Sequence, residues 1–354
     1  MRTLKAEATE SPFPVVIIES EDAHMKVLII GNPDRYERYC PEDMPLAHSA
    51  ERVFCPRGST SETLLAAAAD ADFIAADPMS PIERACIENM PKLKAIHTEG
   101  VGFNLVDTQA AAERGIYVCN CAGVNAGAVA EQTVLLMLAV LRDAINGHCA
   151  VCEGRQMQFK EHMMTAGGRE LSDCHIGLVG LGAIGTETAR RLRPFGARLS
   201  YYNRRRRSEE EEEALGIAYL PLEELAERCD IVSLHVPVTP ETVKMVDDAF
   251  LRRMKKTAYL INTSRGDLVD NDALCRALTE GEIAGAGLDT ISPEPVTADN
   301  PLLQLPEEAR RKLVLSPHIG GITEGSFVRS HRMIWQCFTD VAEGRRPQHI
   351  VNGL

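Results

Sequence analysis

The segment from His175 to Arg207 constrains the fold of this chain more than any other. A short apolar run, Ile176–Val179, leads into the sequence GLGAIG at Gly180–Gly185. A helical pattern follows and stops at Gly196, and a second apolar run extends over Ala197–Tyr202. Strand, glycine turn, helix and strand within about thirty residues are typical of a Rossmann dinucleotide-binding unit.

Each glycine of this motif has a separate physical role in such a site. Gly180 permits the tight turn, Gly182 lets the backbone approach a pyrophosphate, and Gly185 lets the helix pack on the strand. The N-terminus of the following helix offers N–H groups and a positive dipole end to phosphates. The motif alone is weak evidence, but its flanks favour a nucleotide site over a structural turn.

The end of the second strand bears on which dinucleotide binds. An acidic residue usually stands about 20 residues beyond the glycines and binds the ribose 2′-hydroxyls. Here Asn203 ends the strand, and Arg204, Arg205 and two further arginines follow it. Asn203 would not repel a 2′-phosphate, and arginine pairs bidentately with one, so the sequence favours NADP(H) over NAD(H). Alternatively, the arginines form a solvated run balanced by Glu209–Glu213, which could hold for two of the four.

Composition narrows the class of protein. The 354 residues, 45% of them hydrophobic, suffice for two domains. A net charge of -13 argues against a nucleic-acid or membrane-surface partner, and no stretch approaches the ~20 apolar residues of a transmembrane helix. The eleven cysteines and the histidines show no disulfide-rich or metal-site spacing. We therefore expect reduced thiols, a cytoplasmic location and no metal site.

Strand and helix patterns alternate along the chain, which predicts two α/β units with parallel sheets. We expect a first domain of residues 1–124, in which residues 1–24 are an extension. A nucleotide-binding domain of residues 125–321 follows, in which Pro240–Arg252 is predicted to be helical. Residues 322–354 are expected to return to the first domain.

The segment Gly127–Arg142 is long, strongly apolar and free of helix breakers. It is predicted as a buried helix rather than a membrane segment, because Glu131, Gln132 and Arg142 bound it. Its excess hydrophobicity also suggests packing on a second subunit, and hence a homodimer. A helix central to one chain's own core would look similar.

Four polar segments follow predicted strands, where open α/β sheets bind ligands. They are Glu99–Asn104, Asn262–Gly266, Asp289–Pro295 and Ser316–Gly321. The first, with Gly100, Val101 and Gly102, offers backbone N–H groups that suit a carboxylate, although an ordinary loop is equally compatible with it. The second places Arg265 as a fork for a carboxylate or carbonyl, with a surface ion pair as the alternative.

The other two segments carry acid–base candidates. Asp289 and Glu294 lie in a proline-stiffened loop, and His318 stands between Pro317 and two glycines. Histidine is the usual acid–base group at neutral pH, and His318 has the most favourable context of the ten. His235, at another strand end, comes next.

Taken together, GLGAIG, HVPVTPET, INTSRGDLVD, GAGLDTISPEP and SPHIGG stand in an order and at spacings that resemble the D-isomer-specific 2-hydroxyacid dehydrogenases. The resemblance covers nearly everything from Met25 to the C-terminus. It implies a Rossmann-like nucleotide domain inserted in a flavodoxin-like substrate domain. It also implies Arg265 as the substrate-binding arginine, Glu294 as the catalytic glutamate and His318 as the acid–base group.

The resemblance further assigns binding positions. The amides of Gly100–Gly102 are implied to hold the substrate carboxylate. The remaining candidates belong to the nucleotide site, and His235 is placed among them. The cofactor positions are Gly180, Gly182, Ala183, Ile184, Gly185, Asn203, Arg204, Arg205, His235, Pro237, Thr242, Thr263 and Asp289.

The expected activity is reduction of a small 2-keto acid, such as glyoxylate or hydroxypyruvate, to the D-2-hydroxy acid. Arg265 would polarise the carbonyl and protonated His318 would supply the proton, with Glu294 favouring the imidazolium form. Alternatives are a phosphoglycerate or D-lactate-type dehydrogenase and a nucleotide-sensing, corepressor-like binding protein. Substrate choice is expected to depend on side chains near Met79 and Gly100. Departures from the family pattern include Gln132, where many members have histidine, and Glu99, which we expect to point away from a bound anion.

Overall fold

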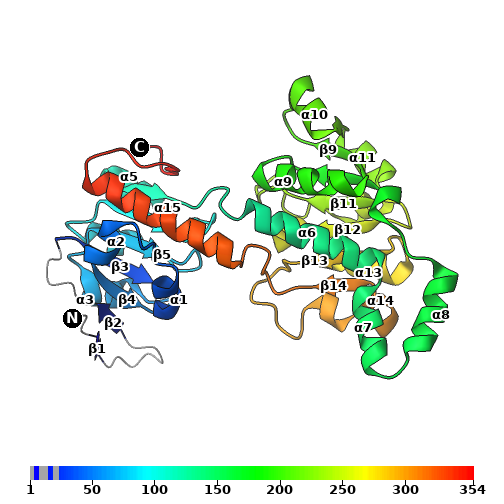
Figure 1. Cartoon of the computed structure of the whole chain (residues 1–354), viewed down its shortest axis with the longest axis horizontal. Helices are drawn as coiled ribbons and strands as arrows, with labels where there is room; N and C mark the ends of the chain where they lie inside the picture. Colours follow the sequence, from blue (N-terminus) through cyan, green and yellow to red (C-terminus); the bar gives the residue numbers. More distant parts are fainter. Residues whose placement is uncertain (1–3, 8–14, 19–23) are drawn as a thin grey trace. The chain divides into compact units, whose positions relative to one another are not determined.

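The computed structural model describes residues 4–7, 15–18 and 24–354, and its contacts divide the chain into two compact units (Figure 1). The first unit comprises the residues up to Asn125 together with Thr323–Leu354, and the second comprises Ala126–Ile322. Each boundary lies one residue from the position expected from the sequence.

The first unit is built on a sheet in the order β1-β2-β4-β3-β5-β6-β7. The five strands from β4 to β7 are parallel and follow the flavodoxin-like order. Their sequences are almost continuously buried, as expected where helices cover both faces. The strands are β1 (Leu4–Glu7), β2 (Val15–Ile18), β3 (Lys26–Ile30), β4 (Glu51–Cys55), β5 (Phe73–Ala76), β6 (Ala95–Thr98) and β7 (Tyr117–Cys119).

Part of the expected N-terminal extension belongs to this sheet. Strand β2 pairs antiparallel with β4, with Val16 opposite Phe54, and β1 pairs antiparallel with β2. The other residues of 1–23 lie outside the described part of the chain.

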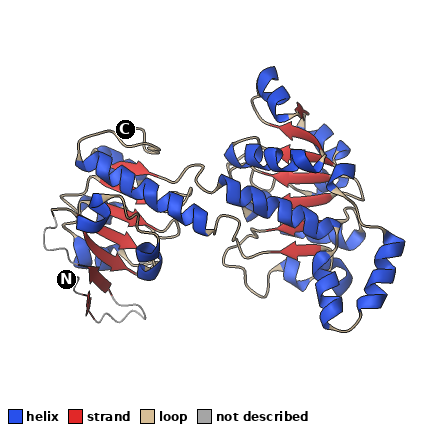
Figure 2. Cartoon of the chain, viewed as in Figure 1, coloured by secondary structure: helices blue, strands red, loops and turns tan. Residues whose placement is uncertain are grey.

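The helices of the first unit lie on both faces of the sheet (Figure 2). They are α1 (Pro33–Arg38), α2 (Pro45–Ser49), α3 (Ser61–Ala68), α4 (Arg84–Glu88), α5 (Thr108–Glu113) and α15 (Glu324–Ala342). The last of these carries the chain back from the second unit. Its Phe338 is fully buried and stacks on Phe73 of β5 with the ring centroids 4.7 Å apart.

The second unit has an entirely parallel sheet in the order β10-β9-β8-β11-β12-β13-β14. Strands β8 and β11 are neighbours at the centre of the sheet. The strands that follow β8 are added on one side of this pair, and the strands that follow β11 are added on the other. The carboxyl ends of these two strands therefore form the switch point at which such sheets bind ligands. The strands are β8 (His175–Val179), β9 (Arg198–Tyr202), β10 (Ile217–Tyr219), β11 (Ile231–Leu234), β12 (Tyr259–Asn262), β13 (Gly285–Leu288) and β14 (Leu313–Leu315).

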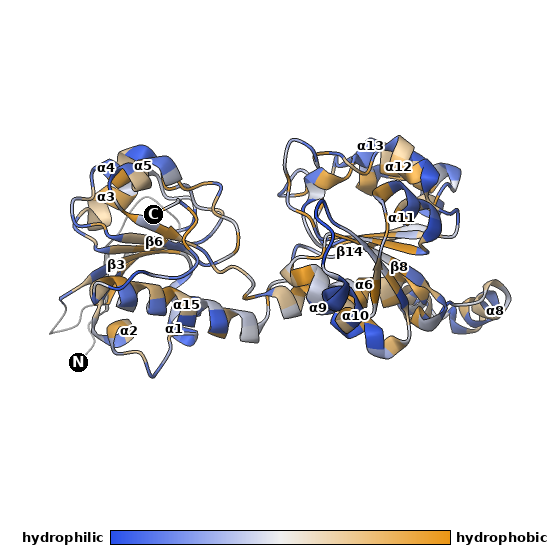
Figure 3. Cartoon of the chain, turned by 90° about the horizontal axis from the view of Figure 1, so that it is seen from above, coloured by the Kyte–Doolittle hydropathy of each residue, from blue (hydrophilic) through white to orange (hydrophobic). Residues whose placement is uncertain are grey.

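Helices cover both faces of this second sheet, and Figure 3 shows apolar strands between helices with hydrophilic outer surfaces. The α-helices are α6 (Ala126–Leu141), α7 (Ala144–Cys152), α8 (Gln156–Ala166), α9 (Ala183–Leu192), α10 (Glu209–Leu215), α11 (Leu222–Arg228), α12 (Asp248–Arg253), α13 (Asn271–Glu280) and α14 (Glu307–Arg310). Short 3₁₀ turns occur at Leu171–Asp173, Arg193–Phe195, Gly266–Leu268 and Pro301–Gln304. The two-unit α/β fold predicted from the sequence is thus confirmed.

The apolar helix α6 packs on α9, β12 and β13, and most of its residues are buried within its own unit. Its hydrophobicity is therefore explained largely by that core. Within the described residues no single helix is long and apolar enough to cross a membrane, and the α6–α7 pair that reaches the required composition is bent by 64°.

The prediction of a helix over Pro240–Arg252 is wrong for its first half. Helix α12 spans only Asp248–Arg253, with Asp247 as its N-cap. Before it, the Thr242 hydroxyl accepts the Thr239 N–H and donates to the Pro237 carbonyl, which stabilises a turn. Lys244 then adopts a left-handed conformation with φ 52°, which ends any helical path.

Candidate active site and nucleotide site

Two of the three glycines in the turn between β8 and α9 have no room for a side chain. Gly180 has φ 102°, and a Cβ there would lie 2.6 Å from the His235 carbonyl oxygen. A Cβ at Gly185 would lie 2.2 Å from the Gly180 carbonyl oxygen. A Cβ at Gly182, in contrast, would meet nothing within 4 Å. Gly180 and Gly185 therefore serve the fold, whereas Gly182 faces open space.

The start of α9 is suited to phosphate. Gly182 is its N-cap, and no side chain of a described residue forms a hydrogen bond with its first turn. Ala183 and Ile184 form that turn, so its N–H groups remain available to a ligand. The open space at Gly182 and the uncapped helix end together fit a dinucleotide pyrophosphate.

The strand end at Asn203 is tied directly to this turn. Leu181 N–H donates to Asn203 Oδ1 at 2.7 Å, and the Leu181 carbonyl accepts a hydrogen bond from Arg207 Nη2, also at 2.7 Å. Both backbone groups of Leu181 are thus held by side chains beyond β9. The Asn203 amide group retains its two N–H donors for a ligand.

The four arginines divide into two pairs. Arg206 forms a bidentate ion pair with Glu212, which lowers the pKa of that carboxyl group to about 2. Arg207 pairs with Glu211. Arg204 and Arg205 are exposed and make no hydrogen bond or ion pair with any described residue. Two of the four arginines are therefore structural. Of the other two, Arg204 acts on the Glu241 carboxyl group only through its charge, and neither donates a hydrogen bond to a described residue.

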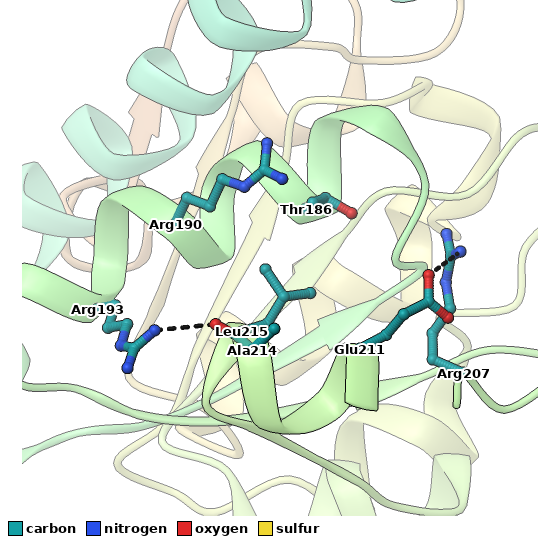
Figure 4. Close-up of a pocket in the computed structure, with 7 residues that line it drawn as sticks. All are labelled: Thr186, Arg190, Arg193, Arg207, Glu211, Ala214 and Leu215. Atoms are coloured by element: carbon teal, nitrogen blue, oxygen red, sulfur yellow. Dashed lines mark hydrogen bonds and ion pairs between the residues drawn. The ribbon is translucent and has the colours of Figure 1, made fainter. Parts of the chain in front are cut away.

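A pocket of about 500 Å³ lies between α9 and α10 (Figure 4). Arg193 donates to the Ala214 carbonyl across it, and the Arg207–Glu211 ion pair borders it. None of the site residues predicted from the sequence lines this pocket, and we assign it no role.

The loop after β11 lies against the glycine turn. His235 contacts Ser233 through Nε2, at 3.0 Å, and burial lowers the pKa of His235 to about 4. The imidazole is therefore neutral at pH 7 and is unsuited to act as a general acid. Pro237 and Thr242 form the turn described above, and Thr263 after β12 is buried with its hydroxyl 2.8 Å from Thr133 of α6.

His318 and Glu294 form a close pair at the carboxyl edge of the second unit's sheet. His318 Nδ1 lies 3.0 and 2.9 Å from the two carboxylate oxygens of Glu294. Both residues are exposed, and the ring's Nε2 makes no hydrogen bond with a described residue. His318 also has φ 56°, a left-handed conformation that is uncommon for a non-glycine residue. Such local strain clusters at functional sites.

Asp289 supports the loop that carries His318. Its carboxylate is buried and accepts hydrogen bonds from the N–H groups of Ile319, at 3.1 Å, and Gly320, at 2.8 Å, and from the Ser316 hydroxyl. Its carbonyl accepts the His318 N–H at 2.8 Å. This positioning role was not apparent in the sequence, and a role of Asp289 toward the cofactor remains a prediction.

Helix α6 contributes to the same support. Gln132, the residue that departs from the family pattern, donates from Nε2 to the Ser316 hydroxyl at 2.9 Å. The sequence did not predict this hydrogen bond, because more than 180 residues separate Gln132 from Ser316.

Arg265 is exposed beside these groups. Its Nη1 donates to the Ser264 carbonyl at 2.8 Å. The backbone carbonyl of Arg265 accepts a hydrogen bond from Asn262 Nδ2, also at 2.8 Å. A Cβ at the next residue, Gly266, would lie 2.2 Å from the backbone nitrogen of Ser292. The missing side chain thus lets the Arg265 loop touch the loop that carries Glu294.

In the first unit, the Gly100–Gly102 loop follows β6 with its carbonyl groups tied inward. The Gly100 carbonyl accepts hydrogen bonds from Cys121 N–H and the Thr98 hydroxyl, and the Val101 carbonyl accepts one from Asn120 Nδ2 at 2.7 Å. This arrangement suits a loop whose N–H groups bind an anion.

Glu99, directly before that loop, is buried rather than directed into solvent. It pairs with Arg35 of α1 and with His331 of α15, whose Nε2 lies 2.8 Å from Oε1. The expectation that Glu99 avoids a bound anion is consistent with these partners.

Comparisons with known proteins agree with this geometry. Residues 134–320 match the model of the D-isomer specific 2-hydroxyacid dehydrogenase NAD binding domain. The chain is 38% identical to a glyoxylate reductase of Korarchaeum cryptofilum over 80% of its length and 83% of that protein. It is 39% identical to a glyoxylate reductase of Thermofilum pendens over 82% and 84%. The structure also resembles Aquifex aeolicus D-lactate dehydrogenase complexed with NAD and lactic acid, at TM-score 0.75 and 28% identity, covering 90% of this chain and 96% of that one.

The chain therefore belongs to the D-isomer specific 2-hydroxyacid dehydrogenase family. It is an oxidoreductase of the nicotinamide-dependent class that acts on CH–OH groups, which confirms the family and the class of enzyme predicted from the motifs.

The glycine turn yields a paired prediction. Gly185→Ala should lower the free energy of unfolding by about 1–3 kcal/mol, because the added methyl group meets a backbone oxygen. Gly182→Ala should leave that free energy unchanged but weaken dinucleotide binding, because its methyl group points into the open space. Denaturant unfolding and calorimetric titration would measure the two effects. Equal stability of both variants would contradict the assignment.

Proposed function

We propose that this protein reduces small 2-keto acids of the glyoxylate or hydroxypyruvate type to the D-2-hydroxy acids and prefers NADPH. The observation that carries the proposal is the His318–Glu294 pair next to the exposed Arg265. The glyoxylate reductases among its relatives support the choice of substrate.

The hydrogen bonding of His318 defines the proton path. Glu294 occupies Nδ1, so the proton for the substrate oxygen is held at Nε2. Arg265 pairs with the substrate and stabilises the charge that develops on the carbonyl oxygen. A bound nicotinamide nucleotide would supply the hydride to the carbonyl carbon. We assign binding of the substrate carboxylate to the amides of Gly100–Gly102.

The first experiment is to follow oxidation of NADPH and of NADH with glyoxylate, hydroxypyruvate and pyruvate, each in turn. Fast oxidation with a keto acid supports the proposal. Preference for pyruvate would favour a D-lactate-type dehydrogenase, and tight nucleotide binding without turnover of any keto acid would favour a nucleotide-sensing protein.

His318→Ala should lower turnover about a hundredfold or more, the scale of lost acid–base catalysis, with the dissociation constant for the dinucleotide unchanged. Steady-state kinetics and fluorescence titration of the nucleotide would test this. Ser316→Ala is a companion variant that keeps the imidazole but removes one donor to Asp289, and it should lose much less activity. Normal turnover in His318→Ala would exclude His318 from the mechanism.

The preference for NADPH rests on Asn203, Arg204 and Arg205. The first places amide donors where a carboxylate would repel a 2′-phosphate. The other two are exposed and form no salt bridge with a described residue, although the charge of Arg204 acts on the Glu241 carboxyl group. Since charge-assisted hydrogen bonds to phosphate are strong, these groups favour the phosphorylated dinucleotide.

Changing both Arg204 and Arg205 to Ala should raise the KM for NADPH much more than that for NADH. Arg206→Ala is the matched control, because its guanidinium is already paired with Glu212, and it should leave the ratio of the two KM values unchanged. An equal rise for both dinucleotides in the double variant would make these arginines ordinary surface charge.

We also propose that the protein is a homodimer, with α8 in the interface. The described side chains of α8 include none that is buried, and Met157 and Met164 are largely exposed on it. Figure 1 and Figure 3 both show the helix extending from the rest of its unit. Because an isolated helix of this length is marginal in water, a covering surface would stabilise it. We also propose a cytoplasmic location, because none of the described cysteines forms a disulfide, which fits a reducing compartment.

Changing Met157 and Met164 to Asp should convert the dimer to a monomer, as measured by sedimentation velocity. Gln158→Asp adds a charge to the same helix at an exposed polar position and should leave the dimer intact. A monomeric wild-type protein, or a double variant that remains dimeric, would refute the interface.

A further inference from the structure

Two adjacent residues of helix α15 contact the supports of the Gly100–Gly102 loop, to which we assign the substrate carboxylate. His331 Nε2 lies 2.8 Å from Oε1 of Glu99, the residue directly before the loop. The carbonyl oxygen of Ser330 lies 3.9 Å from the sulfur of Cys121. Cys121 in turn donates its N–H to the Gly100 carbonyl at 2.9 Å. The same turn of α15 therefore contacts the loop's two neighbours, Glu99 before it and Cys121 beside it.

His331 is held in a fixed orientation inside the first unit. Its side chain is fully buried, and its ring lies against those of Tyr36 and Tyr39, with the centroids 4.6 and 5.8 Å away. Its Nδ1 is also buried and has no hydrogen-bond partner among the described residues. Because an ionised carboxylate only accepts hydrogen bonds, His331 presents a proton at Nε2 and donates it to Glu99. The two tyrosine rings fix the direction of this donor.

Neutralising the charge of Glu99 does not by itself explain this contact. The Glu99 side chain is 4% exposed, and its Oε2 already pairs with the guanidinium of Arg35. Burying a histidine with one unpartnered nitrogen is costly, so a second task for His331 is expected. Arg35 belongs to α1 and His331 to α15, so the two together fix the carboxylate from two different helices. The Glu99 backbone is fixed as well, since its N–H donates to the Ala76 carbonyl at 2.8 Å.

The composition of the loop makes such external support necessary. Gly100 and Gly102 flank Val101, and glycine leaves the backbone more conformational freedom than any other residue. N–H groups bind an anion well only when they converge on it before it arrives, because ordering them afterwards costs affinity. The direction of these N–H groups therefore depends on the residues that anchor the loop, and Glu99 is the nearest of them.

We propose that Glu99 and His331 are positioning residues that hold the N–H groups of Gly100–Gly102 in the arrangement that binds the carboxylate of the 2-keto acid. This inference rests on the proposed function, because it takes this loop as the carboxylate site. It gives α15 a role in substrate affinity in addition to its packing on the sheet.

The experiment compares three replacements of His331 in steady-state assays with glyoxylate at saturating dinucleotide. His331→Leu removes the donor and should raise the KM for glyoxylate about tenfold, the scale of a lost hydrogen bond to a charged group. The kcat should change much less, because binding lost equally from the ground state and the transition state raises KM alone. The dissociation constant of the dinucleotide, which binds in the second unit, should be unchanged.

The other two replacements differ only in the reach of a side-chain amide. In His331→Gln the amide extends to about the position of Nε2, so this variant should restore most of the wild-type KM. In His331→Asn the amide is one methylene shorter and falls short of Glu99, so its KM should resemble that of His331→Leu. This pair keeps the test decisive even if His331→Leu does not fold.

Phe338→Leu is the control for lost packing. Phe338 is buried on the same helix against Phe73, and it makes no hydrogen bond to the loop. This variant should lower the Tm but leave the KM for glyoxylate unchanged. Circular dichroism would verify the folding of every variant.

The outcomes separate the two proposals. If the wild-type enzyme reduces no keto acid, the proposed function fails and this inference with it. If glyoxylate is reduced but the KM is the same in His331→Asn and His331→Gln, the function stands and the positioning role is overturned. A rise in KM as large in Phe338→Leu as in His331→Asn would also overturn it, because the effect would then come from lost stability. A raised KM that glutamine alone restores supports the proposal.

Discussion

The buried carboxylate of Asp289 is the interaction on which the candidate site at the carboxyl edge of the second unit's sheet depends. A buried carboxylate is costly unless hydrogen-bond donors satisfy it, and here all the donors come from the loop after the neighbouring strand. A Cβ at Gly320 would lie 2.9 Å from the carboxylate, so glycine is needed for this approach. His318 lies inside the loop in a left-handed conformation costing about 1–3 kcal/mol. A change of this conformation would break the hydrogen bonds that Ser316, Ile319 and Gly320 donate to Asp289. The backbone of His318 therefore keeps its conformation, and among the described residues its ring contacts only Glu294, through Nδ1.

The first unit solves the same physical problem with different residues. At the end of β6 the inward-facing carbonyls of Gly100 and Val101 are satisfied by Cys121, Thr98 and Asn120. The N–H groups of Gly100–Gly102 donate to no described residue, so they are the groups that we propose for a ligand. The general tendency of open α/β sheets to bind ligands at the carboxyl ends of strands thus has a local cause here. At these two edges, buried polar side chains fix the loops so that the unsatisfied groups face solvent.

Much of this organisation was predictable because it is local in sequence. The glycine motif fixed strand β8, the turn and helix α9 within a few residues, and the apolar runs located most other strands. The failure at Pro240–Arg252 came from turn chemistry, since the Thr242 hydroxyl and the left-handed Lys244 override a sequence that looks helical. The supports of the candidate site were not predictable. Gln132 reaches Ser316, and Glu99 reaches His331, over more than 180 residues, and no local pattern reports such partners.

Asn203 shows how a structural role and a ligand role can be separated at one position. Its Oδ1 accepts the Leu181 N–H and so ties the end of β9 to the glycine turn. An aspartate could accept the same hydrogen bond, so this structural task does not explain the choice of asparagine. Compared with aspartate, asparagine provides two N–H donors and has no negative charge. Neither property is needed for the hydrogen bond to Leu181, so both would matter only to a bound ligand. Arg206 and Arg207, in contrast, have a structural role. They form ion pairs with Glu212 and Glu211 and so hold α10 in place. The donors at this strand end that form no hydrogen bond with a described residue belong to Asn203, Arg204 and Arg205, and the proposed preference for NADPH rests on them.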